Sequence, residues 1–253
     1  MDGDSQKTIS RILGCVRRAD TTYGLFDEGD RVLVGISGGK DSLTMLDALS
    51  RYRRFSKASF ELRAVMIDMG FEKTDEYKEK EKDIVSFCDR AGVPFEILPS
   101  KISEVVFGEH EGKKACGLCA RMRHRALLEY AKDTGCGKIA LGHHREDAVD
   151  TFFMNLIYEA RLGSTAAKRR LEGTETEIIR PLILTPEKEI VRYAKEAQLP
   201  VLDSLCPMDR HTEREEIRRF LSNLDKSHRG VYHRVFKAMR GEAGSPDDIL
   251  TKL

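Results

Sequence analysis

The sequence has no hydrophobic run long enough to cross a membrane, and its polar start, MDGDSQK, lacks the apolar stretch of a signal peptide. We therefore expect a cytoplasmic protein with no membrane partner. The chain also has almost no net charge, because 43 Lys and Arg residues face 42 Asp and Glu residues for a total of +1. This net charge neither indicates nor excludes binding to nucleic acid, so only local clusters of positive charge can indicate such binding.

Cysteine is sparse as well, with six residues in a chain of 253. In an intracellular protein of this size, free thiols or metal ligands are expected in preference to disulfides. Charged residues make up 34% and hydrophobic residues 40% of the chain, which is typical of a globular protein and not of a disordered one. Internal repeats and low-complexity segments are absent.

Short β-branched runs alternate with longer amphipathic stretches, which is typical of an α/β fold with a mainly parallel sheet and helices on both faces. We expect strands at 31–37, 61–68, 94–99, 138–141 and 177–184, and helices at 41–54, 74–91, 118–133, 148–158 and 186–197. A helix around 8–18 and a charged helical tail from 212 onward lie outside this alternation. The expected division is an N-terminal helical segment (1–28), a catalytic domain (29–205) and a C-terminal cysteine loop with a helical tail (206–253).

A glycine-rich stretch, GISGGKDS at residues 35–42, follows the first expected strand and opens a helix. It is not a Walker A loop, because Val34 stands where the first Gly is needed and Asp41 stands where Ser or Thr should follow the Lys. It is not the dinucleotide G-x-G-x-x-G pattern either, because two residues separate its first glycines. At the carboxyl end of a strand, Gly38 and Gly39 can still aim backbone N–H groups at an anion.

The side chains of this loop indicate which anion it binds. Ser37 and Ser42 can donate hydroxyl groups to phosphate oxygens, and Lys40 can neutralise charge. Asp41 would repel phosphates unless a Mg²⁺ ion lies between them. The loop therefore favours ATP with Mg²⁺ over a glycine-rich turn without a ligand.

The pair Cys116 and Cys119 forms a CxxC motif, which fits half a zinc site, a redox pair or part of a cluster site. The distant Cys206 precedes a Pro in an expected irregular segment, so these three form the candidate ligand set. Zinc would need a fourth ligand such as His110 or His211. A 4Fe–4S cluster held by three thiolates would leave one iron free for an exogenous sulfur species.

The other cysteines have structural interpretations. Cys15 and Cys88 fall among apolar helix positions and are expected to be buried. Cys136 is expected in a turn before the fourth strand.

Residues 37–42 match the SGGxDS signature of the PP-loop ATP pyrophosphatases, and the chain resembles that superfamily. The resemblance implies a Rossmann-like, adenine nucleotide α-hydrolase-like fold and cleavage of ATP between its α and β phosphates. CxxC at 116–119, GHHxxD at 142–147, IRPL at 179–182 and a downstream Cys206 follow in that order. This order, over roughly residues 10–220, is similar to that of the tRNA 2-thiocytidine synthetase group.

The resemblance implies a role for each matching position. Cys116, Cys119 and Cys206 would ligate a 4Fe–4S cluster, and with Lys40 and Asp41 they form the expected catalytic set. The positions expected to bind ATP and Mg²⁺ are Ser37, Gly38, Gly39, Lys40, Asp41, Ser42, Asp68, Gly142, His143 and Asp147. For Asp68, His143, His144 and Asp147, a satisfied strand-end or helix-capping residue remains the alternative. Asp203 departs from many relatives, which have a Cys at that position.

Basic residues suggest where RNA could bind. Arg121, Arg123, His124 and Arg125 directly follow the CxxC motif, and a loop is expected around Lys168, Arg169 and Arg170. Arg218 and Arg219 are expected on a solvated helix face. Phe107, Phe152 and Tyr158 are the candidates for stacking on bases.

The expected activity is that of an ATP-dependent tRNA sulfurtransferase that adenylates a pyrimidine carbonyl, of cytidine by resemblance, and replaces its oxygen with sulfur. The expected partners are tRNA, a sulfur donor (a cysteine desulfurase or sulfide) and a second copy in a homodimer. Three alternatives stay open. They are an iron–sulfur desulfidase or thiolase that acts on a small molecule or on another tRNA base (giving 2-thiouridine), a PP-loop amide-forming ligase, and a zinc-stabilised nucleotide-binding module.

Overall fold

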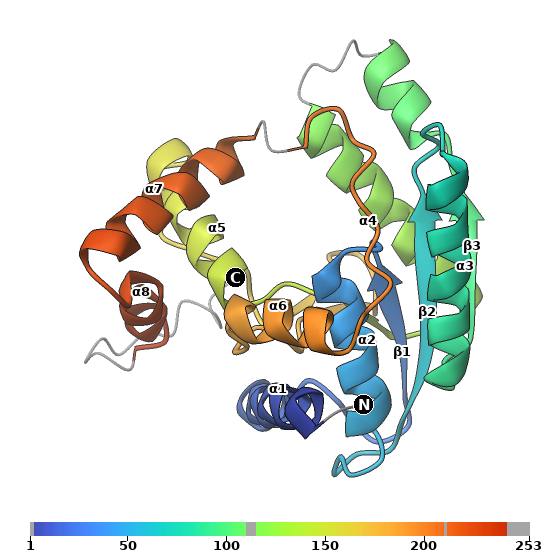
Figure 1. Cartoon of the computed structure of the whole chain (residues 1–253), viewed down its shortest axis with the longest axis horizontal. Coiled ribbons are helices and arrows are strands. Elements are labelled where there is room, and N and C mark those ends of the chain that lie inside the picture. Colours follow the sequence, from blue (N-terminus) through green and yellow to red (C-terminus); the bar gives the residue numbers. More distant parts are fainter. Residues whose placement is uncertain (1–2, 110–114, 210–211, 242–253) are drawn as a thin grey trace.

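The computed structural model describes residues 3–109, 115–209 and 212–241 and has the expected alternation of strands and helices (Figure 1). Its strands are β1 (Asp30–Ile36), β2 (Phe60–Asp68), β3 (Phe95–Pro99), β4 (Lys138–Ala140), β5 (Lys168–Arg170) and β6 (Glu177–Ile179). Its helices are α1 (Gly3–Tyr23), α2 (Lys40–Tyr52), α3 (Asp75–Arg90), α4 (Ala115–Asp133), α5 (Arg145–Tyr158), α6 (Glu187–Glu196), α7 (Glu213–Ser227) and α8 (Val231–Met239), and a short π-helix, η1 (Glu104–Glu109), precedes α4.

The strands form one sheet in the order β3-β2-β1-β4-β6-β5. Every pairing is parallel except that of β5 with β6. Because β1 lies between β2 and β4, the direction in which the sheet is built reverses beside β1. The carboxyl ends of β1 and β4 therefore flank a topological switch point, the usual ligand-binding position in open α/β sheets.

Side chains of β1 alternate between two apolar cores, one on each face of the sheet. Val32 and Val34 belong to the larger core, to which α1, α2, α3 and α6 also contribute buried side chains. Leu33, between them, packs in a second core with Leu127 of α4 and Ile139 of β4. A strand buried on both faces needs apolar residues at every position, which explains the unbroken run that begins at Val32. The expected α/β fold with helices on both faces is confirmed.

Two expectations about the far edge of the sheet were wrong. Residues 168–170, expected in a loop, form β5, because their backbone pairs antiparallel with β6. The expected strand 177–184 ends at Ile179 and continues in turns, in which Ile183 N–H bonds to the Arg180 carbonyl at 3.1 Å. Pro181 lacks the N–H group that a further ladder bond would require.

No helix among the described residues is both long and apolar enough to cross a bilayer.

Candidate functional site

The loop between β1 and α2 is held in shape by Ser42, a residue of the helix it opens. The Ser42 hydroxyl accepts from the Ser37 backbone N–H at 3.1 Å and donates to the Gly39 carbonyl at 3.0 Å. Gly38 has a φ of +81°, a conformation that residues with a Cβ rarely adopt. The N-terminus of α2 receives no side-chain cap from Gly39, so its N–H groups are available to an anion.

Lys40 sits between two carboxylates at this helix start. Its Nζ lies 3.1 Å from Asp41 Oδ1 and 3.0 Å from Glu187 Oε1. Burial alone would lower the pKa of Lys40, but these two carboxylates outweigh it and raise the pKa. Burial raises the pKa of Asp41, which the nearby His144 and Lys40 only partly offset. A cation such as Mg²⁺ at Asp41 would favour the ionised carboxylate and so fits this position.

Glu187 is a site residue that the sequence analysis missed. It is the first residue of α6, after Pro186, and its partner Lys40 lies far away in the sequence. A carboxylate in the first turn of a helix is ordinary, so the sequence offered no signal for this contact.

The turn after β4 packs against the start of α2 through Gly142. A Cβ at this position would lie 3.0 Å from the Ser42 backbone nitrogen and 3.1 Å from the Asp41 carbonyl carbon. The absence of a side chain therefore lets the ends of β4 and α2 touch, backbone to backbone.

His144 is the buried centre of a group of carboxylates. Its side chain is 1% exposed, its Nε2 lies 3.4 Å from Asp147 Oδ2 and 3.7 Å from Asp41 Oδ1, and its Nδ1 lies 3.4 Å from Glu146 Oε2. Burial lowers the pKa of His144, but the carboxylates outweigh that effect and raise it. His143, by contrast, has its pKa lowered to about 3 by burial and by Arg180, so it is neutral at physiological pH. The two adjacent histidines thus have opposite electrostatic roles.

Asp147 both caps α5 and pairs with arginines of α7. Its Oδ2 accepts from the His144 backbone N–H at 3.0 Å, which starts α5 three residues earlier than the sequence predicted. Its Oδ1 lies 3.4 Å from Arg214 Nη1 and 3.1 Å from Arg218 Nη2. Burial would raise the pKa of Asp147, but the neighbouring His144 and Arg214 hold it below its ordinary value. The capping interpretation of Asp147 is therefore realised, with ion pairs added.

The expectation that Arg218 lies on a solvated helix face was wrong. Its Nε lies 3.1 Å from Oδ2 of Asp150, whose side chain is fully buried, in addition to the pairing with Asp147. These carboxylates raise the pKa of Arg218 despite its burial. Arg218 holds α7 against α5 in the structure.

A cavity of about 410 Å³ joins the glycine-rich loop to the candidate cysteines. Ser37 and Gly39 line it, together with Asp68 from the end of β2 and the residues 202–206. Cys116, Cys119 and Cys206 all line the same cavity, although Cys206 comes from a different part of the chain. All three are free thiols, with Cys116 exposed and the other two partly exposed.

The three thiols influence one another electrostatically. Burial raises the pKa of Cys119, Arg123 lowers it, and the neighbouring Cys206 and Cys116 raise it further. Thiols that oppose one another's ionisation are favourable ligands for a cationic centre, which binds the thiolate form and displaces the proton.

The arrangement of donors distinguishes between the possible centres. In the described part of the chain, no three His, Cys, Asp or Glu side chains converge as ligands of a single metal ion. A 4Fe–4S cluster takes each thiolate on a different iron, so its ligands need not converge on one point. The three soft sulfur donors of this cavity therefore fit a cluster. His110 and His211, the fourth ligands considered for zinc, lie outside the described residues.

The residues between α6 and Cys206 run past the glycine-rich loop toward α4 (Figure 1). The Leu202 N–H group donates to the Gly38 carbonyl at 2.9 Å. A Cβ on Gly38 would lie 2.7 Å from Leu202 Cδ1, so the two segments are in direct contact. This contact positions Cys206 in the cavity that the loop borders.

Asp68 has protein partners at the end of β2. It accepts from the Gly70 backbone N–H at 2.9 Å and from Lys73 Nζ at 2.8 Å, and Lys73 also lies 2.6 Å from Glu81 Oε1. Asp68 is therefore a strand-end residue whose carboxylate has hydrogen-bond and ion-pair partners within the protein. Asp68 still lines the cavity together with Lys73 and Glu81, two residues that the sequence analysis missed.

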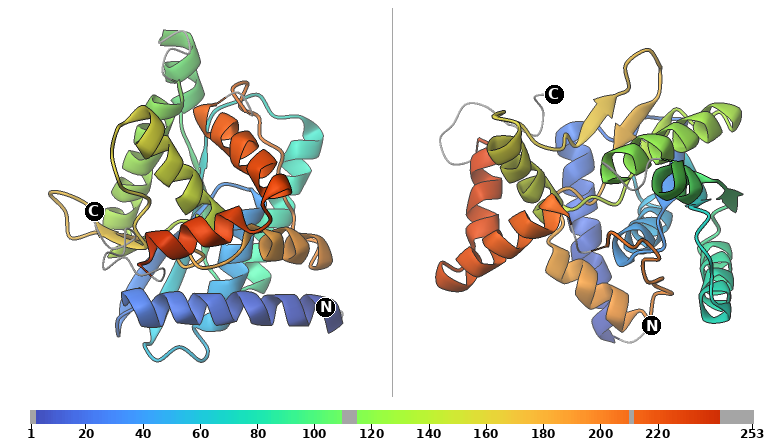
Figure 2. Two further views of the ribbon diagram at one scale, coloured as in Figure 1. Left: turned by 90° about the vertical axis from the view of Figure 1, so that its left-hand side faces the viewer. Right: turned by 90° about the horizontal axis from the view of Figure 1, so that it is seen from above.

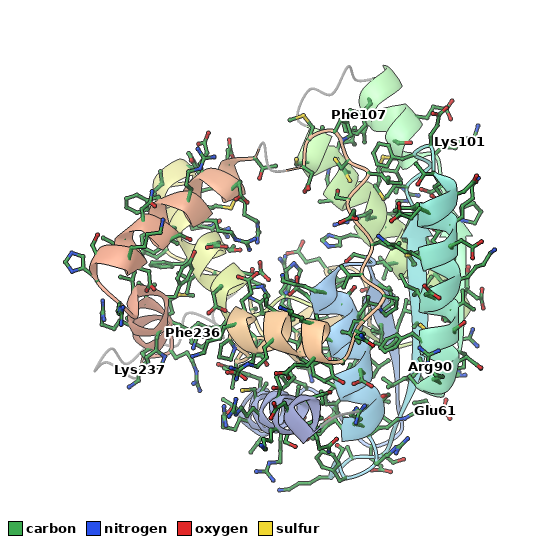
Figure 3. All side chains as sticks on the ribbon, viewed as in Figure 1. Glu61, Arg90, Lys101, Phe107, Phe236 and Lys237 are labelled. Carbon is green, nitrogen blue, oxygen red and sulfur yellow. The ribbon has the colours of Figure 1, made fainter. Side chains whose placement is uncertain are left out.

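Some of the candidate RNA-binding residues line the cavity, and others lie away from it on the surface. Arg123 lines the cavity, whereas Arg125 pairs with Glu129 at 2.8 Å on the surface of α4. Of the aromatic candidates, Phe107, which lies on η1 (Figure 3), lines the cavity. Tyr158 lies on α5, where its hydroxyl bonds to Glu216 of α7 at 3.4 Å.

Comparison with known proteins agrees with this geometry. A family described as the PP-loop domain matches residues 8–224. The tRNA-cytidine(32) 2-sulfurtransferase of Methylococcus capsulatus is 37% identical over 246 residues, which cover 95% of this chain and 81% of that relative. The chain belongs to this PP-loop family. The enzyme of the same name from Stenotrophomonas maltophilia is 36% identical over 93% of this chain and 76% of its own length.

The fold of this PP-loop protein also has a solved counterpart. The U34-tRNA thiolase of Methanococcus maripaludis, solved with its 4Fe–4S cluster, superimposes with a TM-score of 0.70 at 24% sequence identity. The match covers 92% of this chain and 80% of the thiolase. The family predicted from SGGKDS and the cysteine pattern is confirmed by the PP-loop domain match and by the 37% identical relative.

Proposed function

We propose that this chain is an ATP-dependent tRNA sulfurtransferase that converts a cytidine of tRNA to 2-thiocytidine. The observation that carries the proposal is that three free cysteines line the same cavity as the PP-loop. A PP-loop enzyme that forms amides would have no use for these thiols. The names of the relatives, tRNA-cytidine(32) 2-sulfurtransferases, support cytidine as the target.

In the proposed reaction, the carbonyl oxygen of the pyrimidine attacks the α-phosphate of ATP and pyrophosphate leaves. The N–H groups at the start of α2, with the hydroxyls of Ser37 and Ser42, would bind the leaving phosphates. Lys40 would exchange its contact with Glu187 for a phosphate oxygen, and Asp41 would hold the Mg²⁺ that neutralises the leaving group. A sulfur nucleophile then replaces the activated oxygen at the ring carbon, and AMP departs.

Cys116, Cys119 and Cys206 are the proposed ligands of a 4Fe–4S cluster. When bound, the cluster would supply an iron without a protein thiolate, where sulfur can be held. The contribution of the chain is to fix the cysteines: Leu202 ties the segment of Cys206 to Gly38, and α4 carries the other two. The sulfur would come from a cysteine desulfurase or from free sulfide.

The test is anaerobic purification, iron and zinc analysis, and incubation with tRNA, ATP, Mg²⁺ and sulfide, followed by nucleoside mass spectrometry. We expect bound iron and ATP-dependent 2-thiocytidine in the wild type, and loss of both in Cys206→Ala. Cys136→Ala is the matched control, because Cys136 is buried in the core under α4. A colourless protein with stoichiometric zinc, or a Cys206→Ala variant that keeps its iron and its activity, would contradict the proposal.

A further inference from the structure

Arg180, directly after β6, is a partly buried cation with no acidic partner in the described part of the chain. Its Nη1 donates to the Ala166 carbonyl at 2.6 Å, and its Nε donates to His143 Nδ1 at 3.4 Å. Within residues 3–109, 115–209 and 212–241, no carboxylate lies within ion-pair distance of its guanidinium. With five N–H donors on the group, several remain available to a ligand.

This environment disfavours the charged guanidinium. Burial, with a smaller contribution from Arg169, lowers the pKa of Arg180 to about 10. His143 does not compensate, because its own pKa is lowered to about 3 and its neutral ring only orients the guanidinium. Burying a positive charge costs desolvation free energy unless an anion lies close enough to balance it. The site is therefore electrostatically incomplete in the free protein.

Other basic residues extend from Arg180 toward the cavity. Arg169, on the adjacent β5, is exposed and has no ion pair among the described residues. On the α4 side, burial lowers the pKa of His124, and the charges of Arg123 and Arg180 lower it further, so both guanidinium groups act on this ring. Arg123 lines the cavity beside Cys119. We call Arg123, Arg169 and Arg180 the basic strip.

In the sheet, Arg169 and Arg180 lie on the other side of the switch point from Asp68. The cavity is lined by residues at the ends of β1 and β2, whereas Arg180 and His143 follow β6 and β4. In the sheet order, β6 is two strands from β1, a separation of about 10 Å. The β5–β6 hairpin that carries Arg169 projects from the edge of the sheet (Figure 2). A nucleotide bound at the PP-loop and extending toward Asp68 would leave the β4–β6 side for the second substrate.

We infer that Arg180, oriented by His143 and supported by Arg169, binds a backbone phosphate of the RNA substrate near the nucleotide to be modified. The inference rests on the proposed function, of which it names the RNA-phosphate site. A phosphodiester supplies the missing negative charge and two oxygens for the planar guanidinium. The strip then continues through Arg123 to the cysteine cavity, so that the adjoining base can enter the cavity while its backbone stays on the surface.

The test is tRNA affinity at several salt concentrations for the full-length protein, with ATP affinity measured in parallel. Arg180→Gln keeps an amide donor for the Ala166 carbonyl, and Arg169→Ala alters an exposed side chain. The control is Arg192→Ala, which removes the same charge from an exposed residue of α6 that pairs with Glu196. We expect the first two variants to weaken tRNA binding about tenfold. Each should also reduce the slope of log affinity against log salt by about 0.7 to 0.9, with ATP affinity unchanged.

Unchanged tRNA affinity and slope in Arg180→Gln and Arg169→Ala would overturn the inference. A loss of ATP affinity with normal tRNA binding would overturn it too, since the site would then hold a nucleotide phosphate. Failure of the proposed function has a different signature, because a wild type that binds tRNA through these arginines and makes no 2-thiocytidine refutes the function and keeps the phosphate site.

Discussion

Replacing Gly38 with Ala should detach the cysteine segment from the PP-loop. The added Cβ would lie 2.7 Å from Leu202 Cδ1 and 3.0 Å from Leu202 Cβ, so Leu202 must move. The backbone also has a φ of +81° there, which costs about 1–2 kcal/mol for a residue with a Cβ. Forcing a methyl group into a packed site adds about 1–3 kcal/mol. The free energy of unfolding should therefore fall by about 2–5 kcal/mol.

Gly39→Ala is the matched control for this prediction. Gly39 has a φ of −75°, and the nearest atom to a new Cβ would be Ser37 Oγ at an ordinary 3.5 Å. We expect its free energy of unfolding to stay within about 1 kcal/mol of the wild type. Since 1 kcal/mol corresponds to about 2–4 °C for a chain of this size, Gly38→Ala should melt about 4–20 °C lower than the wild type.

The assay combines thermal unfolding with the alkylation rate of each cysteine, followed by peptide mass spectrometry in the metal-free protein. In Gly38→Ala, Cys206 should react faster than in the wild type, because the segment that carries it loses its bond to the PP-loop. Cys88 should remain unreactive in every variant, because it is buried and its pKa is raised to about 12. Melting temperatures of the two glycine variants within 2 °C of each other, with equal Cys206 rates, would refute the reasoning.

Two further predictions concern the charges around α5. Burial raises the pKa of Glu146, but His144 and Arg145 outweigh it and lower the pKa to about 2. Glu146→Gln should therefore be about 3 kcal/mol less stable at pH 7. Urea titrations should show the difference vanishing as the pH falls from about 4.5 toward 2; a difference independent of pH would contradict this. Arg218→Ala leaves the buried Asp150 without its arginine and should lower the free energy of unfolding by about 3 kcal/mol more than Arg219→Ala, its neighbour on α7; equal losses in urea unfolding would show that the ion pair contributes nothing.

The sequence was sufficient where the determining interactions are local. The run from Val32 to Ile36 predicts a buried strand, and the glycines, Lys40 and the serines that follow predict a phosphate loop. The burial of Cys15 and Cys88 was also predicted correctly, since both lie among apolar helix positions. In each case the pattern and its physical cause lie within a few residues of each other.

The errors lie where a distant segment decides the outcome. Residues 168–170 are all basic and have no strand pattern, yet they pair with β6 and form β5. Arg218 lies on a helix rich in charge, where one arginine looks like the next, and its buried partner Asp150 is 68 residues away. Glu187 likewise reaches Lys40 only because α6 packs beside α2. Tertiary packing selects these partners, and the periodicity of the sequence contains no information about which distant segments pack together.

The position of Cys206 shows how the two kinds of information combine. Its own surroundings predict only an irregular segment, and nothing in them specifies a cavity. That segment follows α6, whose first residue, Glu187, contacts Lys40, and it touches Gly38 through Leu202. The PP-loop therefore meets α6 and the segment after it at two points, before the chain reaches the cysteine. Because the PP-loop holds the segment that carries Cys206, both motifs line one cavity. For the same reason, a substitution at Gly38 should change the reactivity of Cys206.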